Sequence, residues 1–335
     1  FNLEQARATV YQFPDPDDST SYGLVTAFPD NSHALTAECE VVFPDKSNQK
    51  LLKYTLPPVV SSSIFGFNVP LNTAYNSTDT TWATSADDYG LHVRAIRSPA
   101  TWAEKNAPLE KVQDAYFAVY DRAGTQLLAS NIFQNVYDNK KWNLALSIRP
   151  NKYQFYDGVA GTASPGYLVE LCGVNYDSGY EQHSFAVSAS YSDGADLLTS
   201  AKRFYLGAYR TNQTGTNVLQ ATDIRGSSLR LWSDYLPSGT IGLHAKEVDS
   251  YGRLNPYENA YQFQTDNPQS FIPKAQTLIM NWDFATITGS NSSGRFLVTD
   301  FSSGSTDGST FPDYPGTYQG AYSNLNLRKH SGRGD

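Results

Sequence analysis

The chain has 335 residues and a net charge of −8, from 25 basic and 33 acidic side chains. A mildly acidic chain without a basic stripe is not expected to bind nucleic acid, and no apolar run approaches the length that membrane insertion requires. Charged residues are only 17% of the chain, whereas it has 23 tyrosines and 17 phenylalanines, which is typical of an extracellular or virion β protein.

The first part of the chain, residues 1–58, is predicted to be a small β segment. Short runs with strand composition, such as Ala37 to Phe43, are separated by turn clusters rich in proline and aspartate. Pro57 and Pro58 mark the end of the segment. It is either the end of a preceding domain or an accessory sheet on the main one.

The main domain is predicted over residues 59–267. Strands are expected at Ile64 to Val69, Gly90 to Ile96 and Ala115 to Tyr120, and Asp121 to Gly124 reads as a hairpin turn. The stretch from Pro150 to Pro165 is predicted to be an exposed loop at the rim of the domain, where binding residues are often found.

The middle of the chain carries the strongest strand patterns. Apolar and polar residues alternate from Trp142 to Arg149, which predicts a strand with one buried face. Residues Tyr167 to Val174 are apolar on both faces apart from Glu170, which predicts a strand buried on both sides. Two more strands are predicted at Arg203 to Tyr209 and at Asp223 to Trp232.

Directly after these strands, between Tyr235 and Ala245, the apolar period changes from two to that of a helix. Ile241, His244 and Ala245 fall on one face of a short helical turn, and Ser238 can cap its start. We therefore interpret His244 as a packing residue and not as a metal ligand or an acid–base catalyst.

This order of elements resembles the laminin-G-like, concanavalin A-like lectin and glucanase family over Ser61 to Asp266. Five features in chain order carry the resemblance. They are a strand that begins with Trp142, a strand that ends in Gly173, the Leu-Gly-Ala strand at Leu206 to Ala208, the Asp-Ile-x-x-x-x-Leu-Arg-Leu-Trp strand at Asp223 to Trp232, and the short helical turn at Leu236 to Ala245. The resemblance implies an all-β fold, namely a concanavalin A-like (jelly-roll) antiparallel β-sandwich with small β flanking segments. It does not fix function, because the fold hosts lectins, hydrolases, adhesion modules and spacers.

The last part, residues 268–335, is predicted to be a linker followed by an extension or by the start of a further module. Thr277 to Phe284 reads as a strand and resembles the opening strand of another domain of the same family. Gly294 to Val298 reads as a second strand.

The two cysteines, Cys39 and Cys172, lie far apart in predicted strands. Free buried thiols are the favoured interpretation, because buried cysteine behaves as a small hydrophobe. A disulfide between them stays open as the alternative.

Catalytic motifs are missing from the sequence. Glycoside hydrolysis needs two carboxyl groups roughly 5–10 Å apart, and glucanases of the resembled family carry them as Glu-x-Asp-x-x-Glu on one strand. That motif does not occur here, and Glu170 stands alone on its predicted strand. We therefore expect a protein that is not an enzyme and has no catalytic residues.

Two sets of residues are candidates for ligand binding. Trp102 in one loop, with Tyr153 and Tyr156 in another, would form a sugar-stacking surface, although a core or interface role is commoner for such aromatics. Asp87 and Asp88 form an acidic turn with the ligand type that calcium prefers, although most acidic turns bind no ion. No other cofactor is expected.

These observations favour a non-enzymatic protein of the virion surface, such as a tail, fibre or capsid-surface component of a bacteriophage. It would present a lectin-like sandwich for attachment to a host-surface glycan. The chain has a single methionine, begins at Phe1 as a processed product or an excised piece would, and between Asn281 and Ser305 resembles segments of long structural proteins of large tailed phages. Other virion subunits or further copies of the chain are the expected partners.

Two alternatives stay open. The first is a secreted or cell-surface carbohydrate-binding or adhesion module. The second, less favoured because of the missing carboxylate motif, is a glycan hydrolase.

Overall fold

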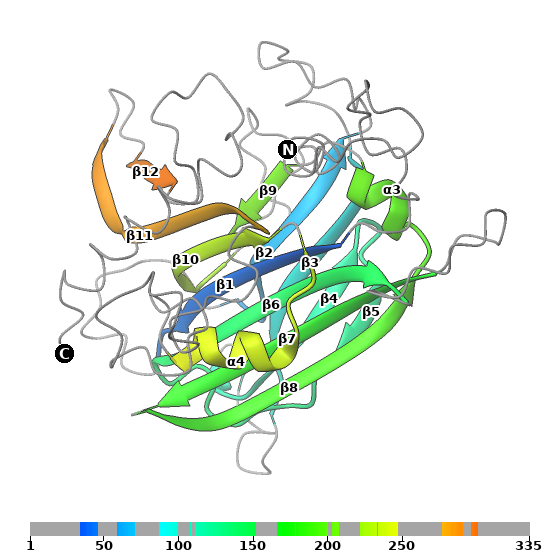
Figure 1. Cartoon of the computed structure of the whole chain (residues 1–335). Coiled ribbons are helices and arrows are strands. Elements are labelled where there is room, and N and C mark those ends of the chain that lie inside the picture. The colour runs from blue at the N-terminus through cyan, green and yellow to red at the C-terminus, as the bar shows by residue number, and fades with distance from the viewer. Residues whose placement is uncertain are drawn as a thin grey trace, which may run out of the picture.

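The computed structural model describes twelve ranges of the chain, namely residues 34–45, 59–70, 87–99, 108, 111–151, 166–177, 179–199, 203–207, 222–232, 234–246, 277–290 and 296–300. In this part of the chain the strands form two antiparallel sheets (Figure 1). Two short helices, α3 (Gly194–Thr199) and α4 (Ser238–Lys246), accompany them. The predicted all-β class is confirmed.

The larger sheet has seven strands in the order β12-β11-β10-β1-β6-β7-β8. Its strands are β12 (Phe296–Asp300), β11 (Leu278–Ser290), β10 (Arg225–Trp232), β1 (Leu35–Phe43), β6 (Lys140–Pro150), β7 (Tyr167–Asp177) and β8 (Tyr180–Tyr191). Every neighbouring pair is antiparallel, and the chain order is interrupted where β1 lies between β10 and β6.

The smaller sheet has five strands in the order β5-β4-β3-β2-β9. They are β5 (Gln126–Ala129), β4 (Ala115–Asp121), β3 (Asp87–Arg97), β2 (Ser61–Pro70) and β9 (Arg203–Leu206). The predicted hairpin joins β4 to β5, and its turn contains Gly124 at φ +83°, a backbone conformation that glycine adopts without strain.

Strand patterns in the sequence explain how the larger sheet presents its two faces. On β6, Trp142, Leu144, Leu146 and Ile148 point into the core, as the alternation predicted. The predicted double burial of β7 is also confirmed, because α4 packs on its outer face and leaves Cys172 only 2% exposed.

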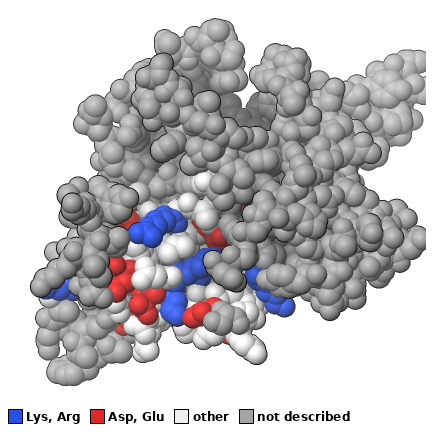
Figure 2. All heavy atoms as spheres, turned by 90° about the vertical axis from the view of Figure 1, so that its left-hand side faces the viewer, with Lys and Arg blue, Asp and Glu red and all other residues white. Residues whose placement is uncertain are grey.

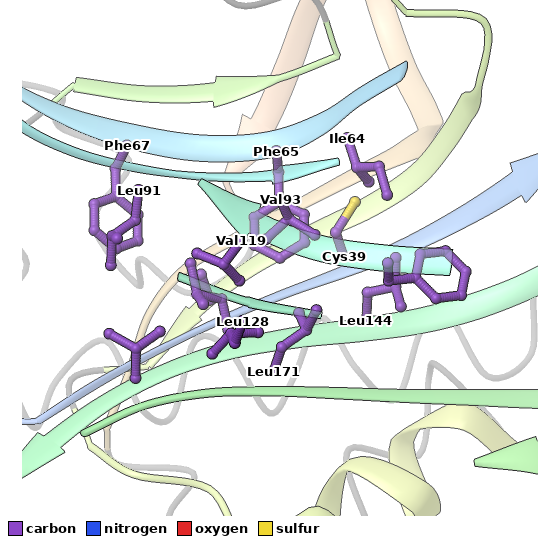
Figure 3. Close-up of a cluster of buried hydrophobic side chains, with 14 of the residues drawn as sticks. Cys39, Ile64, Phe65, Phe67, Leu91, Val93, Val119, Leu128, Leu144 and Leu171 are labelled. Atoms are coloured by element: carbon purple, nitrogen blue, oxygen red, sulfur yellow. The ribbon is translucent and has the colours of Figure 1, made fainter. Parts of the chain in front are cut away.

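The hydrophobic core lies between the two sheets. Figure 3 shows side chains from both sheets meeting there, among them Cys39 of β1, Phe65 of β2 and Leu171 of β7. Burial of each large apolar side chain contributes about 1.5–3 kcal/mol. Both cysteines are free and buried, which confirms the favoured interpretation, because Cys39 faces the core while Cys172 faces α4 on the other side of the sheet.

The larger sheet also contains strands from outside residues 59–267. Strand β1, from the predicted N-terminal segment, is hydrogen-bonded between β10 and β6. Strands β11 and β12 continue the same sheet beyond β10. The described parts of the flanking segments therefore complete the larger sheet.

Candidate functional site

Helix α4 lies across the outer face of the larger sheet, over β6 and β7 (Figure 1). The sequence folds this way because Leu236, Ile241 and Ala245 form an apolar stripe that packs on Trp232 and Cys172 of the sheet. The predicted start at Ser238 and the predicted buried face of this helix are both confirmed.

A buried carboxylate anchors α4 to the sheet. The Nδ1 atom of His244 lies 2.7 Å from Oε2 of Glu38, whose other oxygen accepts a hydrogen bond of 2.9 Å from Asn143 Nδ2. Nη1 of Arg230 lies 3.7 Å from the same Glu38 Oε1, and the His244 ring stacks on Trp232 with 5.4 Å between ring centroids. His244 is therefore a packing residue, as predicted, with an ionic partner that the sequence did not reveal.

The charge state of this anchor follows from its partners. Burial alone would raise the pKa of Glu38, but His244, Arg230 and Asn143 outweigh burial and lower the pKa to about 2. Glu38 is thus ionised at neutral pH and only accepts hydrogen bonds, so Nδ1 of His244 must be the donor. The contact holds the C-terminal half of α4 at a fixed place on the sheet.

An open groove runs beside α4, between the helix and strands β7 and β8. Its volume is about 340 Å³, which lies in the usual range for small-molecule sites. Helix residues form one wall and strand residues form the floor and the other wall: Ser238, Gly239, Gly242, Leu243 and Lys246 from α4, and Cys172, Val174, Tyr176, Glu181, Ser184, Phe185 and Ala186 from β7 and β8.

Two glycines on α4, Gly239 and Gly242, place no side chain in the groove. A Cβ atom added to Gly239 or Gly242 would meet nothing within 4 Å, so neither glycine is required by packing inside the described part of the chain. The floor opposite them is also built from small side chains, Ser184 and Ala186 of β8 and Cys172 of β7. Open space therefore lies beside both glycines on the helical wall.

One end of the groove is polar and aromatic. The Tyr176 hydroxyl donates a hydrogen bond of 3.4 Å to Glu181, and Nζ of Lys246 lies 6.0 Å from the Tyr176 ring centroid. Burial, followed by the nearby Glu181 carboxylate, raises the pKa of Tyr176. This end thus offers an aromatic ring between one carboxylate and one ammonium group.

None of the predicted site residues is among the described residues that line this groove. Trp102, Tyr153 and Tyr156 lie outside the described residues. Asp87 and Asp88 begin β3, and their side chains also lie outside what the structure describes. Within the described ranges, no three His, Cys, Asp or Glu side chains are grouped so as to hold a metal ion.

Glu170, which stands alone as a carboxylate on its predicted strand, lies on β7. Its Oε1 accepts hydrogen bonds from the Tyr235 hydroxyl at 3.0 Å and from the Cys172 thiol at 3.4 Å, and Arg149 lies 3.7 Å from Oε2. These contacts fix the start of the α4 segment on the sheet.

Sequence reasoning missed the groove residues, although the chain contains a signal for them. Tyr176 continues the outward period of Val174 on β7, two residues beyond the end of the predicted strand. Gly239 and Gly242 interrupt a predicted helix, against the helix propensity of glycine.

Charged side chains of both signs lie on the described surface. On the face shown in Figure 2, described acidic and basic side chains lie interspersed. None of the described helices combines the length and the apolar character needed to cross a bilayer.

Comparison with known proteins finds similarity only at the level of solved structures, among them two structures of a bacteriophage tailspike protein. No protein-family model matches the chain, and no curated protein matches it. The full-length tailspike protein 2 of the Escherichia coli O157:H7 bacteriophage CAB120 matches over 65% of this chain and 22% of its own, with 7% identity and a TM-score of 0.32. The enzymatically active domain of bacteriophage CBA120 tailspike protein 2 matches over 65% of this chain and 24% of its own, with 8% identity and a TM-score of 0.26. The chain thus spans about a quarter of the length of either structure.

The expectation that the chain is not an enzyme is corrected by this comparison, since one of the matched structures is an enzymatically active domain. The expectation rested on the absence of one carboxylate motif from one strand. A missing linear motif does not exclude catalysis, because a β scaffold can assemble its reacting groups from several strands and loops.

Proposed function

We propose that this chain is a surface part of a virus particle, of tail, fibre or capsid-surface type, and that it binds a host-surface glycan in the groove beside α4. We further propose that its sandwich is the concanavalin A-like, laminin-G-like jelly roll that the sequence resembles. The observation that carries the binding function is the open groove on the outer face of the larger sheet, with Tyr176 at one end.

The arrangement of strands supports the proposed fold type. Two antiparallel sheets face each other across one core, and their strand orders are not sequential. The helix α4 follows the last predicted strand of the signature, where the resemblance implies a short helical turn.

The chemistry of the groove supports a sugar as the ligand. A sugar ring presents an apolar C–H face, which packs on aromatic rings, and hydroxyl groups, which both donate and accept hydrogen bonds. Tyr176 provides the ring, while Ser184, Ser238, Glu181 and Lys246 provide polar atoms along the walls. No single polar group dominates the groove, as is usual in small-molecule sites.

The interactions that hold the walls and the floor of the groove in place favour a preorganised binding site. Glu38 and His244 fix the helical wall, and the floor consists of two hydrogen-bonded strands of the larger sheet. A wall held in this way loses little conformational entropy when a ligand binds.

Two measurements test the proposal. Mass spectrometry of purified virus particles is expected to detect the protein, and a glycan array is expected to show binding by the purified chain. Absence from the particles would remove the virion assignment, and an array without signal above background would remove the glycan-binding function. Glycan binding by a protein that is absent from particles would instead favour the secreted or cell-surface adhesion module.

A further inference from the structure

We infer that the groove selects an uncharged hexose unit, and that Gly242 determines this selection by leaving room for the sugar ring against the helix. The inference rests on the proposed glycan-binding function and narrows it to one class of sugar. It is carried by the charge balance of the lining residues and by the empty space beside the glycine.

The lining carries no net charge. Among the described residues that line the groove, Glu181 and Lys246 are the only ones with ionised side chains, and their charges cancel. The Cys172 thiol stays neutral because burial raises its pKa, and burial likewise raises the pKa of Tyr176. An acidic sugar needs an excess of positive groups, so this lining does not favour one.

Two of the backbone N–H groups at the start of α4 already have an acceptor within the protein. Helix N-termini attract anions through backbone N–H groups that lack partners. In α4 the N–H groups of Thr240 and Ile241 already donate to the Pro237 carbonyl, at 2.9 and 3.2 Å. These two donors are therefore not available to a carboxylate, sulfate or phosphate group of a ligand.

The glycines give the groove its width at a cost to the helix. Glycine inside a helix is destabilising relative to alanine, and the open space beside Gly242 shows that alanine would fit there. Gly242 lies between Ser238 and Lys246 on the same wall, at the middle of the groove. A larger side chain at this position would occupy the space that we assign to the ring.

At the end of the groove, the side chains of Glu181 and Lys246 would recognise the hydroxyl groups of the sugar by hydrogen bonds. A hydroxyl group can donate to the Glu181 carboxylate, while a second one accepts from the Lys246 ammonium group. The C–H face of the same ring would pack on Tyr176.

The test measures binding of the purified chain to neutral polysaccharides (dextran, mannan and galactan) and to acidic ones (heparin, alginate and polysialic acid). We expect at least one neutral polysaccharide to bind, with a Kd that changes less than about twofold between about 50 and about 300 mM salt. We expect no acidic polysaccharide to bind more tightly. Preference for an acidic polysaccharide, or a strong weakening by salt, would overturn the inference while leaving glycan binding in place.

Variants at position 242 test the role of the glycine. G242L is expected to weaken binding of the neutral polysaccharide about tenfold or more, whereas the matched control T240L, which places leucine on the same helix outside the described lining of the groove, keeps both binding and fold. Circular dichroism and the melting temperature verify that both variants are folded. Wild-type binding by folded G242L would overturn the assignment of Gly242. Failure of the folded wild-type chain to bind any of these polysaccharides would overturn both this inference and the glycan-binding proposal.

Discussion

In the described part of the chain, two buried ionic clusters differ in how completely their polar atoms are satisfied. In the first, Arg97 and Asp223 form an ion pair of 3.1 Å with side chains that are 2% and 0% exposed. Arg97 also donates to the carbonyls of Val59 and Val112, and its guanidinium group lies 3.4 Å from the ring centroid of Tyr137. Asp223 accepts from the Tyr137 hydroxyl at 3.3 Å and from the Val59 backbone N–H at 3.3 Å.

The second cluster is the anchor of α4, centred on Glu38. Here the carboxylate has several partners, but Nε2 of His244 and Oδ1 of Asn143 are buried without a hydrogen-bond partner in the described part of the chain. Buried polar atoms without partners are rare in native proteins, because each costs about 1–3 kcal/mol.

The difference indicates separate roles for the two clusters. The first joins four chain segments that are distant in sequence, and it stabilises the sandwich itself. The second holds a single helix on an already complete sheet, at some cost in unsatisfied atoms. Natural proteins tolerate such costs mainly where an element serves function, and here the element forms one wall of the groove.

The largest predicted decrease in the free energy of unfolding follows from disrupting the cluster of Arg97 and Asp223. Asp223→Ala leaves the Arg97 guanidinium buried without its carboxylate, and removal of one partner of a buried pair destabilises by about 3–5 kcal/mol. Urea unfolding of wild type and variant measures the change in unfolding free energy. A loss below about 1 kcal/mol would show that this cluster is no more important than a surface ion pair.

A smaller loss of stability is expected when the contact between His244 and Glu38 is removed. His244→Phe keeps an aromatic ring against Trp232 but removes the hydrogen bond to Glu38, which should cost about 1–3 kcal/mol. The same variant should weaken polysaccharide binding, because the helical wall is no longer fixed. Unchanged stability and unchanged binding together would contradict the role of the anchor.

Acid titration tests the charge state of the Glu38 anchor. The pKa of Glu38 in the folded protein, about 2, lies below its ordinary value of 4.5. Its stabilisation is therefore fully present above pH 4.5 and is lost as the pH falls from 4.5 towards 2. Unfolding free energies measured across this range should decline in the wild type, and the decline should be shallower in Glu38→Gln. Equal slopes in both proteins would contradict the assigned charge state.

The smallest predicted effect has the opposite sign. Gly242→Ala should stabilise the protein by about 0.5–1 kcal/mol, because alanine is the better helix former and its methyl group meets open space. Thermal unfolding measures the gain. A destabilised Gly242→Ala would show that the space beside this glycine is already filled.

Local patterns predicted the elements but not the site. The alternation from Trp142 to Arg149 and the helical period around Ile241 depend on near neighbours in the chain, and β6 and α4 follow them. The insertion of β1 between β10 and β6 depends on pairing with distant strands, which no local period encodes.

The candidate site combines segments that are still further apart. Glu38 and His244 meet although 206 positions separate them, and the groove forms only where α4 crosses β7 and β8. The sequence showed that β7 is apolar on both faces, which correctly implied a cover on its outer side. It could not show that α4 supplies this cover or that Tyr176 remains beside it.

The most direct test of the central claim compares two tyrosines on opposite sides of the sandwich. Tyr176 lines the groove, while the matched control, Tyr120, lies on the outer face of the smaller sheet beneath Arg94. Binding of a neutral polysaccharide to the purified chain should be lost in Tyr176→Ala and retained in Tyr120→Ala. Retained binding in a folded Tyr176→Ala variant would contradict the assignment of the ligand to this groove.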